Sequence, residues 1–469
     1  MLFCFIRDKK YSFLRKLTQK GVFIMGERVK KKENGLIKGA AWIAAGGFIA
    51  KIIGAIYRIP LTNLIGGKGL GLYQLVYPAY CLLLTVSATG IPSSIAKLTA
   101  ERIRKGQSPR TLFISAMKLF LLVGAGGTAV MAIIAPFLAK AQGSGEVLGG
   151  YYALAPSVLL VSAISVFRGY FQGKNDMMPT ALSEIAEQVI KVAFGLLFAY
   201  LFKERIHLAV VFLLLAVSLS ELFTLFLMLV FYRREKEKTG NDGGRVAFKG
   251  ILRMSIPVTL LSLLIPLSSL IDSVLAVRIL QKYEENAVTL YGLFAGGAVT
   301  VVGLPVSVCY GIAAATIPQV SAEPSGRKAR KKIFKSLGLT ALLGGASAVG
   351  LYLFAEPAVR IIFRSLTSDE KQTLVRLVRA HSISAFTLSC SQTLAACLTA
   401  QGKPQHAALS MLAGVTVKTA SYVFLMKDPK ISIFGLAYAT NLCYLVAFSL
   451  DFMYNLIITK RRIRKEKTR

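Results

Sequence analysis

The chain has 469 residues, of which 54% are hydrophobic and 17% are charged, and its mean hydropathy is +0.57. Soluble domains carry roughly 25% charged residues, so this composition excludes an ordinary soluble enzyme or binding module. The net charge of +34 does not indicate nucleic acid binding. Its basic runs, such as Arg330-Lys331-Lys332, lie beside long apolar stretches, where they fix topology and meet anionic lipid headgroups.

Residues 1–36 form a charged N-terminal segment, expected on the cytoplasmic side, in which Met25 is a candidate for the true start. The apolar runs of this segment are too short for a cleavable signal peptide. Twelve apolar stretches follow, each long enough for the roughly 20 residues of helix that cross a bilayer. The predicted crossings are 37–59, 70–97, 113–139, 148–171, 180–202, 206–231, 251–278, 286–318, 333–357, 373–399, 405–426 and 431–458. The long 286–318 stretch is expected to be tilted or broken at Pro305.

A polar linker at 232–250 divides the crossings into an N-lobe, 37–231, and a C-lobe, 251–458, which a basic tail at 459–469 follows. Gln-Gly-Lys followed by Ala-Leu-Ser occurs once in each half, and a lysine, Lys191 or Lys418, stands ten residues after the alanine. Because six is even, the halves are parallel repeats, which in transporters hold the substrate between them. We therefore predict an all-α integral membrane protein with 12 transmembrane helices in two pseudo-symmetric six-helix lobes.

Most of the 57 lysines and arginines fall in the N-terminal segment, in alternate loops and in the tail. The positive-inside rule places these segments, and hence both termini, in the cytoplasm.

Ionisable side chains at bilayer depth are candidates for the site, because each costs about 2.5–3.5 kcal/mol to insert. Lys51, Lys191 and Lys418 fall near the predicted midplane. Lys51 and Lys418 have no carboxylate one turn away, which favours a wet cavity that accepts an anion. Glu187 precedes Lys191 by one turn, so this pair either neutralises itself or faces the cavity. Arg58 shares a helix face with Lys51 and lies nearer the outer end.

Other charged residues carry weaker expectations. Glu184 lies on the face of Glu187 but nearer the cytoplasm, and Asp272 and Arg278 lie toward the outer end of the seventh crossing, where they can anchor loops. For the isolated Glu221 and Asp451, structural pairing and function are both open. The six cysteines and three histidines have no metal-ligand spacing, and no Walker, GxSxG or HExxH motif is present. The sequence thus predicts no cofactor, no metal and no enzymatic activity.

Three stretches carry a family resemblance: Leu72–Pro78, Ser87–Pro92 and Arg168–Gly173, the last followed by Ser183-Glu184 and Glu187-Gln188. Together they resemble the polysaccharide-transporter branch of the multidrug/oligosaccharidyl-lipid/polysaccharide exporter superfamily, and within it the stage V sporulation protein B-like group. The resemblance implies lobes that form a V around a central cavity, and export of undecaprenyl-diphosphate-linked sugars for peptidoglycan, spore cortex or surface polysaccharide. In related lipid II flippases basic cavity residues hold the diphosphate, and Lys51 occupies a comparable place.

The chain departs from the lipid II flippases in two ways. Its second crossing has no arginine cluster, and it lacks the two additional C-terminal helices of those proteins. Both departures argue against lipid II itself as the substrate. The implied partners are a lipid-linked glycan, membrane lipids and cell-wall synthesis enzymes, with no nucleic acid, and the implied location is the bacterial cytoplasmic membrane. The candidate substrate-binding residues of the cavity are Lys51, Arg58, Arg168, Glu184, Glu187, Lys191, Asp272 and Lys418.

Two alternatives remain open. The first is a cation-coupled drug or metabolite exporter of the same fold, which would favour carboxylates and aromatic side chains over the basic midplane seen here. The second is a membrane glycosyltransferase or polymerase. It would need a large outer loop with catalytic acids, and the longest predicted outer loops, 141–150 and 364–372, are short.

Overall fold

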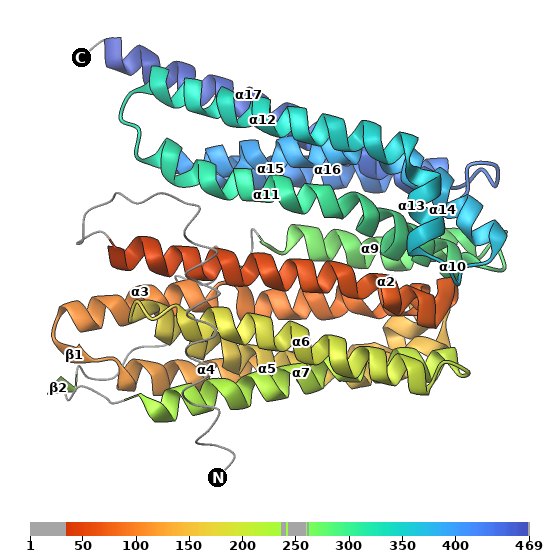
Figure 1. Ribbon diagram of the computed structural model, residues 1–469, viewed down its shortest axis with the longest axis horizontal. Helices are drawn as coiled ribbons and strands as arrows, with labels where there is room; N and C mark the ends of the chain where they lie inside the picture. Colours follow the sequence, from red (N-terminus) through yellow and green to blue (C-terminus); the bar gives the residue numbers. More distant parts are fainter. Residues whose placement is uncertain (1–33, 236–240, 243–258, 260–261, 468–469) are drawn as a thin grey trace.

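The computed structural model describes residues 34–235, 241–242, 259 and 262–467, and Lys51 is among the helical residues whose backbone alone is described. The N-terminal segment 1–33, most of the linker and the start of the seventh crossing lie outside the described residues. Long helices make up two bundles, which spread apart at the end that carries α3 (Ile91–Arg104) and meet at the opposite end (Figure 1). The V-shaped arrangement expected from the resemblance is therefore present.

The N-lobe comprises the elements from α2 to α7. They are α2 (Asn34–Leu84), the π-helical turn η1 (Thr85–Thr89), α3, α4 (Arg110–Ala141), the 3-10 turn η2 (Gly145–Val147), α5 (Leu148–Gly173), α6 (Met178–Leu201) and α7 (Ile206–Arg234). Two short strands, β1 (Gln107–Ser108) and β2 (Asn241–Asp242), pair in parallel beside this lobe and are the sole strands of the described residues.

The C-lobe comprises the elements from α9 to α17. They are α9 (Leu264–Leu280), α10 (Ala287–Gly292), the π-helical turn η3 (Leu293–Ala298), α11 (Val299–Ser321), α12 (Gly326–Leu353), α13 (Ala355–Ile362), α14 (Ser368–His381), α15 (Ser384–Ala400), α16 (Pro404–Leu425) and α17 (Phe434–Lys467). The short helix α13 was not expected, because eight residues give too weak a periodic signal.

Helices occupy the described parts of all the predicted crossings, but their boundaries differ from the prediction at three places. The tenth crossing is divided between α14 and α15. The first crossing and the start of the second form one element, α2, that reverses at Gly66, where φ is 65° and ψ is −172°, and the second crossing continues through η1 into α3. Glycine reaches this conformation without the steric cost that a Cβ would bring. The eighth crossing is not broken at Pro305, which lies within α11, and its irregular turn is η3 instead.

Length and apolar composition identify fewer membrane spans than the twelve predicted crossings. Eight helices in the described residues are long and apolar enough to span a membrane, or nine if α14 and α15, which meet at 43°, form one span. The helix α6 bears the charged residues Glu184, Glu187 and Lys191, and α9 has 17 described residues, so both are weak candidates on composition and length alone. The count of twelve stays a prediction.

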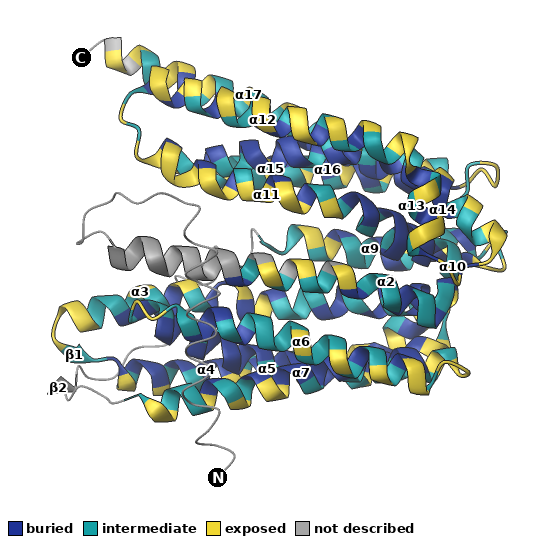
Figure 2. Ribbon diagram, viewed as in Figure 1, coloured by how far each residue is buried: buried dark blue, intermediate teal, exposed yellow. Residues whose placement is uncertain are grey.

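Apolar side chains cover the outer faces of both lobes. Leu122, Ile133 and Phe137 of α4 and Leu342 and Leu353 of α12 are exposed, and Figure 2 shows exposed residues along the outside of α12 and α17. Such extensive apolar exposure indicates surfaces that face lipid. Within each lobe hydrogen bonds between hydroxyl groups connect the helices. The hydroxyl oxygens of Ser157 and Ser218 lie 2.8 Å apart, and those of Thr340 and Thr393 lie 2.9 Å apart.

The lobes meet at one end through close backbone packing and hydrogen bonds, which we call the outer seal because the charge asymmetry predicts this end to be outside. A Cβ added to Gly71 of α2 would lie 2.1 Å from the carbonyl oxygen of Val288 in α10. Asn63 donates to the carbonyl of Ile362 at 2.8 Å, and Gln281 donates to the carbonyl of Gln142 at 3.1 Å. The molecule is therefore closed at the seal.

Arg278 adds a charge to the outer seal. Its guanidinium donates to the carbonyls of Lys140 and Ala141, the last residues of α4. The carboxyl end of a helix carries unsatisfied carbonyls and partial negative charge, so a cation from the other lobe stabilises it. Arg278 was expected to anchor a loop, and in the structure it anchors the end of the helix α4.

Topology can be tested with single cysteines in an otherwise cysteine-free chain. An impermeant thiol reagent should label positions 144 and 369 in intact cells, and should reach positions 328 and 464 after permeabilisation alone, because the positive-inside rule keeps the basic segments in the cytoplasm. Labelling of position 328 in intact cells would contradict the predicted orientation.

Candidate functional site

A cavity of about 470 Å³ lies between the lobes. It is lined by α2 on both sides of its reversal, by α6 and by α11: Ala50, Gly54, Tyr57, Arg58, Leu61, Leu70, Tyr73, Gln74, Tyr77, Gln188, Lys191, Val299, Thr300, Gly303, Leu304 and Ser307. Since the outer seal closes one end, this cavity belongs to the side where the lobes diverge (Figure 1). A concave, partly apolar space with a few convergent polar groups is the usual form of a small-ligand site.

Two of the predicted cations, Arg58 and Lys191, line this cavity together. Arg58 lies eight residues before the reversal of α2 at Gly66, and its guanidinium donates to the hydroxyl of Thr300 across the lobe interface. Lys191 is half-buried on α6 and is in electrostatic contact with Glu187 and Glu221. The cavity therefore holds positive charge contributed by two helices of the N-lobe.

The structure assigns Glu187 a partner other than the expected one. Arg168 of α5 binds Glu187 at 3.0 Å and also donates to the hydroxyl of Ser183 at 3.0 Å. Glu187 is therefore shared between Arg168, with which it forms an ion pair, and Lys191, and does not form an isolated i, i+4 pair with the lysine. Glu184 lies on the side of α6 that faces Gly47 of α2.

Lys51 lies on α2 seven residues before Arg58, which puts the two on one helix face by register. The side chain of Lys51 lies outside the described residues.

Glu221 of α7 is buried beside the cavity. Its Oε1 atom accepts a hydrogen bond from Tyr80, whereas Oε2 has no hydrogen-bond partner among the described residues. The ring of Tyr80 lies beside that of Tyr77, which lines the cavity, with ring centroids 5.6 Å apart and the ring planes tilted by 54°. Glu221 is thus one side chain removed from the cavity wall.

The C-lobe lysine has a different setting from its N-lobe counterpart. Lys418 of α16 is buried, forms an ion pair with Asp272 of α9 and donates to the hydroxyl of Ser268 at 2.9 Å. Asp272, expected near the outer end as a loop anchor, is buried inside the lobe instead. Spacing along one helix could not reveal a partner on another. Within the described residues Lys418 does not line the cavity between the lobes.

Asp451, also left open by the sequence, accepts a hydrogen bond from Ser391 at 2.9 Å. It joins a set of polar contacts between α15 and α17 that includes Gln401 with Asn455 at 2.8 Å. These contacts favour a structural role for Asp451, since hydrogen bonds between helices stabilise membrane bundles.

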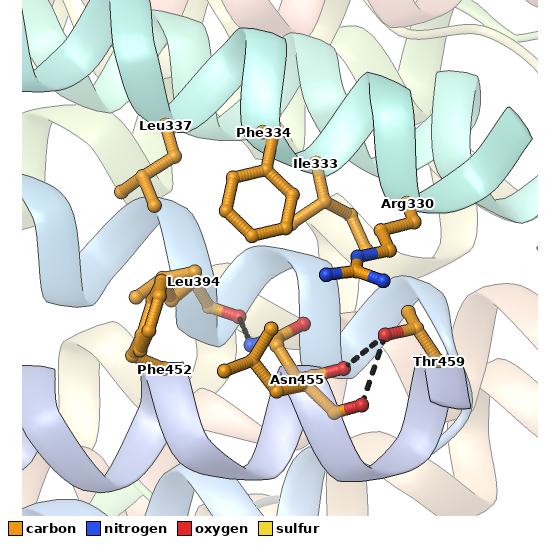
Figure 3. A pocket seen from close by; sticks show the side chains of 9 residues that line it. Arg330, Ile333, Phe334, Leu337, Leu394, Phe452, Asn455 and Thr459 are labelled. Carbon is orange, nitrogen blue, oxygen red and sulfur yellow. Dashed lines mark hydrogen bonds between the residues drawn. The ribbon is translucent and has the colours of Figure 1, made fainter. Parts of the chain in front are cut away.

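A second crevice lies between α12, α15 and α17, beneath Arg330 and Phe334 (Figure 3). The Asn455 amide donates to the Leu394 carbonyl at 3.1 Å, and Thr459 donates to the Asn455 carbonyl at 2.6 Å. The space left is about 10 Å³, which is room for about one water. This crevice is too small for a substrate.

Sequence reasoning missed the uncharged part of the cavity wall. Tyr73 and Tyr77 stack with centroids 5.1 Å apart, and the buried hydroxyl of Tyr57 has no hydrogen-bond partner among the described residues. Gln188 stands three residues before Lys191 and shares its face. That spacing was a usable signal, because residues three and four apart lie on one side of a helix.

Comparison with known families gives one match. Residues 36–323 match the profile of a family described as "Polysaccharide biosynthesis protein". Among individual proteins, the chain is 26% identical to "Stage V sporulation protein B" of Bacillus subtilis (strain 168), over 86% of this chain and 80% of that protein. It is 24% identical to "Lipid II flippase MurJ" of the same organism, over 91% of this chain and 82% of that protein.

Solved structures with the same fold are transporters. An inward-facing multidrug resistance MATE family transporter of the MOP superfamily has a TM-score of 0.74, with 15% identity over 89% of this chain and 96% of that one. The inward closed conformation of Lipid II flippase MurJ has a TM-score of 0.67, with 14% identity over 88% and 87%. The fold class predicted from the sequence, that of an all-α membrane protein with two helical lobes, is confirmed.

The buried ion pair of the C-lobe yields a stability prediction. Lys418→Met leaves the Asp272 carboxylate without its countercharge, and should lower the free energy of unfolding by about 3–5 kcal/mol. Asp272→Leu should cost a similar amount, and the double variant should recover most of the loss. Unfolding of the purified protein in detergent measures all three; a Lys418→Met variant as stable as the parent would contradict the pairing.

Proposed function

This chain belongs to the family of polysaccharide biosynthesis proteins, and we propose that it flips an undecaprenyl-diphosphate-linked sugar across the bacterial cytoplasmic membrane, with both termini in the cytoplasm. The observation that carries the proposal is the cavity between the lobes, which Arg58 and Lys191 line together. Cell-wall synthesis enzymes are the partners expected to supply and consume such a substrate.

The chemistry of the cavity suits a diphosphate joined to a sugar. A guanidinium binds phosphate oxygens through two parallel hydrogen bonds, and an ammonium adds a compact charge. The stacked rings of Tyr73 and Tyr77 offer an apolar face to a sugar ring, while Gln74 and Gln188 offer amide groups to its hydroxyls. Lys51, on the face of Arg58, would receive the headgroup nearer the open end.

The remaining candidates have supporting roles in this proposal. Arg168 shares Glu187 with Lys191 and so leaves part of the Lys191 charge available to an anion. Glu184, one turn from Glu187, would face the entrance between α2 and α6. Lys418 and Asp272 would hold α16 against α9, so that the C-lobe moves as one body.

Transport would proceed by alternating access. In this proposal the cavity of the present structure faces the cytoplasm, since the sealed end is the one that the charge asymmetry predicts to be outside. Release outside would require Gly71 and Val288 to separate and Arg278 to leave the end of α4. No nucleotide-binding motif is present in the sequence, so the energy would come from a gradient, from the membrane potential or from removal of the product.

A cation-coupled exporter of small molecules is the second candidate function. One observation favours it: Glu221 is buried next to the cavity with one carboxylate oxygen unpartnered among the described residues. Under this alternative Glu221 would bind the coupling cation, and removal of the cavity cations would not abolish export.

The two candidates differ in what Arg58 and Lys191 do. Arg58→Gln/Lys191→Gln should lower flipping of an undecaprenyl-diphosphate sugar at least about 100-fold, since two charge-assisted contacts of roughly 1.5–3 kcal/mol each are lost. Depletion of the native protein, complementation with each variant and quantification of lipid-linked sugars that accumulate in the cell measure this effect. Lys203→Gln, on an exposed loop, is the control and should complement fully. Full complementation by the double variant would reject the anionic-headgroup mechanism.

The outer seal is testable through its glycine contact. Gly71→Ala places a methyl group against the Val288 carbonyl, so it should prevent closure and abolish transport. Gly126→Ala is the matched control, because no atom lies within 4 Å of the added Cβ. A cysteine pair at Asn63 and Ser365, which share a 3.2 Å hydrogen bond, should crosslink in the control and lose most crosslinking in Gly71→Ala. Equal crosslinking would show that this contact does not control the seal.

A further inference from the structure

A second cavity, of about 470 Å³, lies in the C-lobe at the end of the molecule that carries the outer seal. Its wall combines three cations with three aromatic rings, and its principal residues are Tyr352, Arg376, Arg379, Lys430, Phe434 and Tyr438. They come from α12, α14, α17 and the segment between α16 and α17. This cavity is separate from the one between the lobes, with which it shares no lining residue.

The three cations are poorly neutralised. Neither Arg376 nor the side chain of Lys430 has an ion-pair partner among the described residues. Arg379 approaches Glu356 at 3.8 Å, but Glu356 also binds Arg360 at 2.6 Å. The Nε atom of Arg379 is buried without a hydrogen-bond partner in the described part of the chain. Two further acids lie near this segment: the Asp428 carboxylate accepts from the backbone N–H of Lys430, and the Glu284 carboxylate accepts from the hydroxyl of Ser432 at 2.9 Å.

This cavity lies at the end of the molecule where the charge pattern of the chain predicts few cations. Most lysines and arginines lie on the predicted cytoplasmic side, yet these three converge at the opposite end, next to α13. Helix α13 joins the two features, because Glu356 in its first turn meets Arg379 and the Ile362 carbonyl at its end accepts from Asn63 of the seal. Topology alone therefore does not account for a cationic cluster here.

The surroundings of the cluster are those of a membrane interface. Tyr352 and Tyr438 are about half exposed, and large apolar side chains near them, including Val349, Leu353 and Leu442, are exposed as well. Tyrosine is enriched where hydrocarbon meets headgroups, and arginine binds phosphate through paired hydrogen bonds. The ligand must therefore present a phosphate at the interface and hydrocarbon below it.

We propose that this cavity binds the headgroup of an anionic glycerophospholipid of the outer leaflet, with phosphatidylglycerol as the simplest example. Arg376, Arg379 and Lys430 contact the phosphate, the tyrosines border the glycerol, and the acyl chains lie along the exposed apolar residues of α12 and α17. The site is independent of the flipped substrate, so its test does not depend on the proposed function.

The test measures binding of phosphatidylglycerol to the full-length protein in neutral detergent micelles. Native mass spectrometry detects the bound lipid, and titration of the protein with the lipid gives its affinity. Arg376→Gln/Lys430→Gln should weaken binding about 30-fold, since each interfacial cation contributes roughly 1 kcal/mol. Lys203→Gln/Lys282→Gln removes the same charge from exposed loops on the same predicted side and should bind like the parent. Photoactivatable phosphatidylglycerol should label the parent protein within residues 426–438.

Three results would overturn the proposal. Unchanged affinity in Arg376→Gln/Lys430→Gln would remove the cluster from lipid binding. Competition by inorganic phosphate at concentrations similar to those of the lipid would identify a free-anion site. Equal binding of phosphatidylcholine would leave no role for the net charge of the headgroup. The photolabelling experiment uses the parent protein, so the proposal is tested even if the double variant does not fold.

Discussion

The low dielectric constant of the membrane interior governs this structure, because every charge placed there needs a partner or water. A buried ion recovers its desolvation cost only through close, well-oriented neighbours. Lys418 finds them in Asp272 and Ser268, and Glu187 finds one in Arg168. Arg58 and Lys191 instead face a cavity between the lobes. The division between charges satisfied inside a lobe and charges left facing the cavity is what separates scaffold from candidate site.

The same constraint shapes the contact between the lobes. Lipid offers no hydrophobic driving force for helix association, so close packing of small residues and hydrogen bonds must hold helices together. Gly71 against Val288 allows backbone contact, while Asn63, Gln281 and Arg278 each use carbonyls of the opposite lobe. Apolar side chains of both lobes, such as Leu72 and Leu280, also belong to one packed cluster at this contact. Opening the seal must therefore separate these side chains as well as break the hydrogen bonds.

Much of the fold could be predicted from the sequence because hydropathy and charge asymmetry report directly on membrane insertion. Helices lie at the expected ranges, and the likeness of Lys191 to Lys418 indicated two related lobes. Contacts between helices could not be predicted. Asp272 was expected to anchor a loop near the outer end of its crossing, because its partner, Lys418, is 146 positions away. The helix α13 was also missed, since eight residues leave little periodic signal, whereas the reversal at Gly66 lies between the first two predicted crossings.

The two repeat-related lysines therefore have equivalent positions in the sequence but different surroundings in the structure. Lys191 and Lys418 stand at matching places in the two halves, yet one lines the cavity and the other is bound within its lobe. If both ammonium groups faced the cavity, an anionic headgroup would meet equal attraction from each lobe, and both lobes would have to release it together. With the charge concentrated on the N-lobe, the C-lobe contributes hydroxyls such as Thr300 and Ser307 and can withdraw first. Under the proposed function, such an asymmetric site suits lobes that part around a charged ligand.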